Sequence, residues 1–198
     1  MMEKLRKVEV QRKTSETEVL LQLNLDGTGS HQIDTEIPFL SHMLTLLSLH
    51  SLCDLKVTAR GDVEVDDHHT VEDIGICFGQ ALDQALGEKR GIRRYGAATI
   101  PMDEALSRVV IDLSGRSVLV YNVELDRESI GNFATENARE FFKAVANGAK
   151  MGIHIDVLRG QNTHHILESI FKAFARALKE AVEIEPRMEG IWSSKGKL

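Results

Sequence analysis

The sequence has few of the features that mark membrane proteins, nucleic-acid-binding proteins or secreted proteins. It contains only two cysteines, Cys53 and Cys77, and both lie in apolar runs, which predicts buried free thiols in a reducing compartment. No cationic segment followed by an apolar run opens the chain, and no apolar run is long enough to span a membrane. Basic residues are scattered and the formal net charge is -6, which argues against nucleic acid as the main partner. We therefore expect a cytoplasmic protein without nucleic-acid or membrane partners.

The sequence also has no linker-like segment, so we expect residues 1–198 to form a single domain. A hydrophobic content of 42% and a charged content of 27% are ordinary for a globular protein of this length. Alternation and turn signals predict strands at 8–10, 18–25, 54–60, 97–102, 107–113, 118–125 and 152–158, and residues 30–37 can return as the partner of a hairpin. Helical spacing predicts helices from Pro38 onward and at 68–87, 132–148 and 163–183.

One motif occurs twice. His68-His69 followed by Glu72 opens one predicted helix, and His164-His165 followed by Glu168 opens another. An ungapped alignment of the two helices also matches five apolar positions, Ile74, Phe78, Ala81, Leu82 and Ala85 with Ile170, Phe174, Ala177, Leu178 and Ala181. An Arg-Gly pair precedes each motif, at 60–61 and 159–160. The sequence therefore predicts a duplication, with repeats at approximately 1–92 and 93–190 and a short tail at 191–198. We expect an α+β fold in which helices cover one face of a mostly antiparallel sheet in each half.

The repeated residues suit a metal centre. Neutral imidazole and carboxylate together favour first-row divalent metals such as manganese, iron or zinc. His68 and Glu72 stand four residues apart and share a helix face, whereas the adjacent His69 points about 100° away. Each histidine pair should therefore serve two metals, and each metal should collect ligands from several elements, which favours sites at a subunit interface. His42 and His154, near the two motifs, are further candidate ligands.

Other interpretations remain open at this stage. Any single histidine can be a capping or hydrogen-bonded structural residue, and we interpret His31 and His50 in this way. The motif differs from the His-Glu-x-x-His of zinc proteases. A dinuclear metallohydrolase acting on a phosphorylated small molecule would release phosphate from a test substrate. A storage or structural metal protein would disperse on metal removal and show no activity when loaded.

Over nearly its whole length the chain resembles the imidazoleglycerol-phosphate dehydratase family. The stretches that carry the resemblance are 12–17, 25–29, 42–44, 61–62, 66–75, 101–106, 112–116, 158–160, 162–165 and 193–196. Two positions depart from the family pattern. Ser41 stands where aspartate is usual, which puts in doubt a partner that orients His42. The tail has Trp192-Ser193-Ser194 where Pro-Ser-Thr is usual, which puts its path in doubt.

The resemblance implies two Mn2+ per active site and a homo-oligomer of 24 subunits that share ligands. It implies eight metal ligands: His42, His68, His69, Glu72, His154, His164, His165 and Glu168. It also implies substrate contacts from Glu16, Arg94, Arg116, Lys172, Ser193 and Lys195. Without the resemblance, Arg94, Arg116 and Lys172 would be read as solvated surface charges.

The implied reaction belongs to histidine biosynthesis and converts D-erythro-imidazole glycerol phosphate to imidazole acetol phosphate and water. Our hypothesis is that a di-manganese-bound imidazolate expels the hydroxyl group. A carboxylate then moves the carbon-bound proton. The candidates for this catalytic role are Glu16, Glu72 and Glu168, and a metal-bound water is the alternative. Glu16 is the first to test.

Overall fold

Two four-stranded sheets and four helices make up most of the chain in the computed structural model, which describes residues 6–196. The first sheet has the order β1-β2-β4-β3 and the second the order β5-β6-β10-β7. The strands of the first are β1 (Lys7–Lys13), β2 (Thr17–Asn24), β3 (His31–Asp34) and β4 (Asp54–Gly61). Those of the second are β5 (Tyr95–Met102), β6 (Ala105–Asp112), β7 (Val118–Asn122) and β10 (Gly152–Arg159). The predicted α+β fold of two similar halves is confirmed.

One predicted pairing is wrong. Residues 30–37 do not return as a hairpin partner; β3 instead pairs in parallel with β4, with Ile33 opposite Val57. The reason lies in the next element, α1 (Pro38–Ser51), because a helix between two strands allows the crossover that a parallel pair requires. The second half repeats this connection, with α3 (Asn137–Ala149) between the parallel strands β7 and β10. Each sheet thus has two antiparallel pairings and one parallel pairing.

The start of the third helix also differs from the prediction. Helical spacing placed its beginning at Asn132, but Phe133–Ala134 form β9, which pairs with β8 (Ser129–Ile130). The helix begins at Asn137. Phe133 is fully buried and its ring lies 5.2 Å from that of Phe39 on α1, so tertiary packing holds this residue outside the helix.

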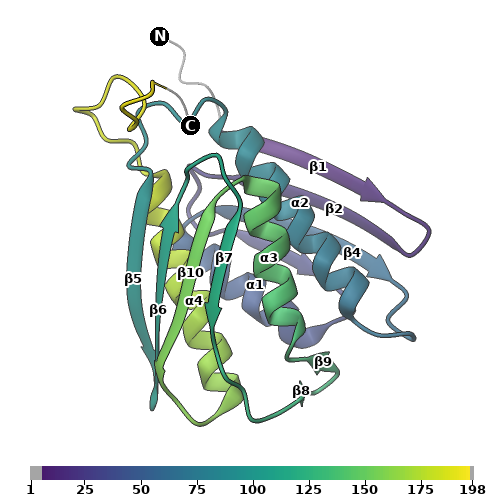
Figure 1. Cartoon of the computed structure of the whole chain (residues 1–198). Helices are drawn as coiled ribbons and strands as arrows, with labels where there is room; N and C mark the ends of the chain where they lie inside the picture. Colours follow the sequence, from purple (N-terminus) through teal and green to yellow (C-terminus); the bar gives the residue numbers. More distant parts are fainter. Residues whose placement is uncertain (1–5, 197–198) are drawn as a thin grey trace.

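The two halves exchange helices, in the sense that one helix of each half packs on the motif helix of the other. The motif helices α2 (His68–Leu86) and α4 (Thr163–Val182) each pack on the sheet of their own half. By contrast, α1 packs on α4 and α3 packs on α2, and Figure 1 shows the helices gathered between the two sheets. At Gly79 the contact between α2 and α3 is so close that a Cβ atom would lie 2.7 Å from the Val145 carbonyl oxygen. Residues of both halves consequently form one core.

Neither a membrane-spanning helix nor a disulfide bond is found in residues 6–196. In residues 6–196 no helix is both long and apolar enough to cross a membrane. Cys53 and Cys77 are buried and free, as predicted, and burial raises the pKa of each thiol to about 11. Both thiols therefore stay protonated and unreactive near neutral pH.

Candidate metal-binding site

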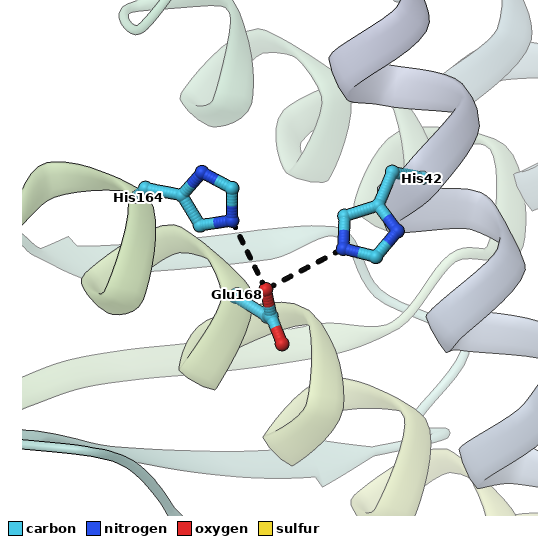
Figure 2. A group of neighbouring side chains, drawn as sticks. All are labelled: His42, His164 and Glu168. Carbon is cyan, nitrogen blue, oxygen red and sulfur yellow. Dashed lines mark hydrogen bonds and ion pairs between the residues drawn. The ribbon is translucent and has the colours of Figure 1, made fainter.

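Three of the predicted ligands meet in one cluster. The Nε2 atoms of His164 and His42 lie 3.1 and 3.5 Å from Oε2 of Glu168, and Figure 2 shows both rings turned toward this carboxylate. One ligand atom from each residue lies within 4.8 Å of the others, a spacing that could hold a metal ion. His42 comes from α1 and the other two from α4, so the exchange of helices builds the cluster from both halves.

The carboxylate of this cluster is held in its charged form. Glu168 is buried, and its second oxygen, Oε1, lies 2.6 Å from Nζ of Lys172 one turn further along α4. Burial alone would raise the pKa of Glu168, but the ion pair with Lys172 and the hydrogen bonds of His164 and His42 outweigh it and lower the pKa. An ionised carboxylate beside two imidazoles is a donor set that suits a divalent metal.

The first motif holds its histidines through the Nδ1 atoms. Nδ1 of His68 lies 3.1 Å from Oδ1 of Asn137 at the start of α3. Nδ1 of His69 lies 3.1 Å from Oδ2 of Asp62, which follows β4, and 3.8 Å from Oε2 of Glu16 in the turn between β1 and β2. Glu16, which the sequence singled out for proton transfer, is thus beside the first motif.

The second motif repeats this arrangement at His165. Nδ1 of His165 lies 2.7 Å from Oε2 of Glu104, and its Nε2 lies 3.7 Å from Oδ2 of Asp103. Both carboxylates belong to the turn between β5 and β6, the counterpart of the turn that carries Glu16. Hydrogen bonding to Glu104 raises the pKa of His165, and hydrogen bonding to Asp62 likewise raises that of His69. The pKa of Glu104 is lowered to about 2, chiefly by its bond to His165.

These contacts leave Nε2 as the ligand atom of His68 and His69. Metal-binding histidines commonly bond their second nitrogen to a carboxylate or another acceptor, which fixes the ring and raises its basicity. Asp62, Glu104 and Asn137 fill this role, and none of them was predicted as a site residue from the sequence. Two of them had a signal, because Asp62 and Glu104 lie in stretches that carry the family resemblance.

Several predicted site residues lie elsewhere in the chain. Arg94 forms an ion pair with Asp112 at 2.7 Å and donates a hydrogen bond to the carbonyl of Trp192 in the tail. Its backbone N–H bonds to Ala181, near the end of α4, whereas His164 lies at the start, about 25 Å away along the helix. Arg116, in the turn before β7, and the tail residues Ser193 and Lys195 have no hydrogen bond or ion pair to the cluster within residues 6–196.

Of the predicted substrate-binding residues, Lys172 is the one that directly contacts the cluster. His154 is exposed on β10, and Glu72 is half-buried on α2. The structure therefore brings together His42, His164, Glu168 and Lys172 in one place and His68, His69 and Glu16 in another. Ser41, the departure beside His42, has its hydroxyl 2.7 Å from that of Thr35.

Fold and site together define a class: an α+β protein of two duplicated halves with histidine–carboxylate centres of the kind that bind divalent metals. Comparison with known proteins makes this specific. The profile of the family described as "Imidazoleglycerol-phosphate dehydratase" matches residues 35–178. The chain belongs to the imidazoleglycerol-phosphate dehydratase family, and it is a hydro-lyase of histidine biosynthesis.

Individual relatives support this assignment over almost the full chain. The imidazoleglycerol-phosphate dehydratase of Syntrophomonas wolfei is 79% identical over 187 residues, which cover 94% of this chain and 95% of the relative. That of Geobacter metallireducens is 54% identical and covers 98% and 99%. The crystal structure of the Staphylococcus aureus enzyme superposes with a TM-score of 0.83 at 44% identity, covering 90% of this chain and 99% of that one.

Proposed function

We propose that the chain converts D-erythro-imidazole glycerol phosphate to imidazole acetol phosphate and water, with two Mn2+ in each active site. The observation that carries this proposal is the meeting of His42, His164 and ionised Glu168 in one cluster, with Lys172 beside it. The cluster offers nitrogen and oxygen ligands for a metal, and the ammonium group of Lys172 offers a partner for a phosphate.

The eight predicted ligands divide between two kinds of position. His42, His164 and Glu168 form the cluster already described. The remaining ligands lie outside it: His68, His69 and Glu72 on α2, His154 on β10, and His165 on α4. Bound manganese would supply Lewis acidity at the nitrogen atoms of the substrate ring. The protein's part is to hold the ligand histidines with Nε2 available, which the acceptors at Nδ1 of His68 and His69 favour.

Glu16 is the best placed of the three carboxylates to move a proton. Its side chain is about half exposed and its carboxylate lies 3.8 Å from Nδ1 of His69, so it can reach a substrate. Glu168 is less suited to this task because both of its oxygens already have partners and its pKa is lowered. Glu72, half-buried on α2, is the second candidate.

We further propose that complete active sites form between subunits of a cytoplasmic homo-oligomer of 24 chains. The separation within one chain supports this, because Arg94 and the tail lie about one α4 length from the cluster. If Arg94, Arg116, Ser193 and Lys195 bind the substrate phosphate, a neighbouring chain must bring them to it. Ligands that point outward from α2 and α4 could be shared in the same way.

The test is to incubate manganese-loaded protein with imidazole glycerol phosphate and follow two products. Formation of the ketone imidazole acetol phosphate at a rate that depends on Mn2+ is the expected result. Release of inorganic phosphate without ketone would instead identify a metallohydrolase. Full metal occupancy with neither product would leave a structural metal protein. A Lys172→Met control should then bind as much Mn2+ as the unchanged chain and likewise form neither product.

A further inference from the structure

His68 is connected to a buried carboxylate through a single amide. Oδ1 of Asn137 lies 3.1 Å from Nδ1 of His68, and Nδ2 of Asn137 donates a 2.9 Å hydrogen bond to Oδ1 of Asp67. The other carboxylate oxygen, Oδ2, accepts a 3.1 Å hydrogen bond from the backbone N–H of Ala134. Asn137 is 2% exposed and Asp67 is 6% exposed, so water has little access to this chain of bonds.

The polarity of each bond follows from the groups at its ends. A backbone N–H can only donate and an ionised carboxylate can only accept, so Asp67 must accept its second hydrogen bond from Nδ2 of Asn137. The amide then has only its oxygen left for His68, and Nδ1 of His68 must carry a hydrogen. The remaining nitrogen, Nε2, is left with its lone pair free.

We infer that Asp67 and Asn137 are positioning residues that fix His68 in the tautomer with Nε2 free to bind a metal. His69 and His165 do not need such a pair, because the carboxylates of Asp62 and Glu104 accept directly from their Nδ1 atoms. An amide can present either end to a histidine, so the tautomer of His68 depends on the group behind the amide. That the ligand of Nε2 is a metal rests on the proposed function; the tautomer itself does not.

Within residues 6–196 this arrangement orients a histidine of the first motif and has no counterpart at the second motif. Asp66 and Asn162 align in the repeat and do the same work, since each accepts a hydrogen bond from the backbone N–H of the first motif histidine. Asp67, however, aligns with Thr163, and His164 has its Nε2 on Glu168 rather than an amide at Nδ1. The two motifs therefore differ at their first histidines: an amide orients His68, whereas a carboxylate contacts His164.

An Asp67→Asn variant should keep the hydrogen bond from the Ala134 backbone N–H and reverse the two hydrogen bonds that follow it. The backbone N–H of Ala134 would hold the new side-chain oxygen, and the new amide nitrogen would face Asn137. The Asn137 amide would then rotate and turn its own N–H toward Nδ1 of His68, which leaves the hydrogen on Nε2. At pH 8, chelator-competition titration with Mn2+ should show affinity at the affected site lowered about 10- to 100-fold.

A reciprocal exchange provides the rescue. In Asp67→Asn/Asn137→Asp the amide nitrogen at 67 donates to the carboxylate at 137, which again accepts from Nδ1 of His68. Charge and side-chain volume are unchanged, so Mn2+ affinity should return to within about threefold of the original value. Asp66→Asn is the matched control: it removes the same charge one residue away, and its amide oxygen can still accept from the His68 backbone N–H.

Neutron diffraction from metal-free crystals reads the tautomer without reference to metal. Hydrogen on Nδ1 of His68 in the original chain and the double variant, and on Nε2 in Asp67→Asn, is the expected pattern. Hydrogen on Nε2 in the original chain would overturn the inference. So would an equal loss of Mn2+ affinity in Asp67→Asn and in Asp67→Asn/Asn137→Asp. If the original chain binds no Mn2+, the proposed function fails, and the neutron result still decides the tautomer.

Discussion

The ion pair between Lys172 and Glu168 should hold the metal-free site together and matter much less once metal is bound. In Lys172→Met the side chain keeps most of its apolar length, but the buried carboxylate loses the ammonium group that lies 2.6 Å from Oε1. Removing one partner of a buried pair typically costs about 3–5 kcal/mol. Glu168 keeps His164 and His42 at Oε2, so we expect about 2–3 kcal/mol for the metal-free protein.

Metal should replace the missing charge. A divalent cation bound at the cluster would compensate Glu168 directly, so the loss in saturating Mn2+ should fall below about 1 kcal/mol. The assay is urea unfolding at fixed chain concentration, with chelator and with Mn2+. Without metal the midpoint should move down by about 1 M, given a slope of about 2–3 kcal/mol/M for a chain of this size.

A control on the same helix separates this effect from a general one. Lys179→Met lies two turns further along α4 and, in the part of the chain that the structure describes, Lys179 has no ion pair. It should change the free energy of unfolding by less than about 0.5 kcal/mol. An equal loss for Lys172→Met with and without Mn2+ would refute the reasoning, because the cluster would then not be where metal binds.

Three further results are expected. Glu16→Gln should lower kcat about 10²- to 10⁴-fold with unchanged metal content; near-normal turnover would remove Glu16 from proton transfer. Deleting the chain after Gly190 takes away the Trp192 carbonyl that Arg94 bonds and should raise KM about 10- to 100-fold at normal metal content, whereas an unchanged KM would end the proposed role of the tail. Lastly, histidine binds metal only when neutral, and the pKa values of His69 and His165 are raised above the usual 6.5. When the pH is lowered from 8.5, Mn2+ affinity should therefore already decrease before pH 6.5 is reached. Titrations between pH 8.5 and 6 check this, and equal affinity at both ends would contradict it.

Local sequence patterns were sufficient to predict most of the helices and strands. The alternation in β2 placed Leu21 and Leu23 in the core, and both are fully buried. Pro38 begins α1 and Gly87 follows the end of α2, as proline and glycine at helix ends predict. The pairing of β3 was predicted wrongly because the sequence of a short strand does not indicate which strand it pairs with. That partner is decided by the helix that follows, whose crossover makes the pair parallel.

The site was predictable only in part. The repeated motif identified the histidines, because two copies with the same spacing are visible in the sequence. The acceptors at their Nδ1 atoms could not be assigned from the motif, since Asp62 and Glu104 lie on turns outside it and Asn137 is 69 positions from His68. Which residues share a cluster was also hidden: His42 reaches Glu168 only because α1 packs on α4 rather than on the helix of its own half.

That exchange of helices changes what counts as an independent part of this molecule. The repeat seen in the sequence is not a unit that could work alone, since the motif helix of each repeat packs on a helix of the other and the cluster takes ligands from both. A recombined enzyme that joined first and second halves from two relatives would have to match α1 to α4 and α3 to α2. Close contacts such as Gly79 against Val145 would decide which halves are compatible. The two helices of each pair should therefore evolve together, so that a substitution on one helix is accompanied by a compensating substitution on its partner in the opposite half.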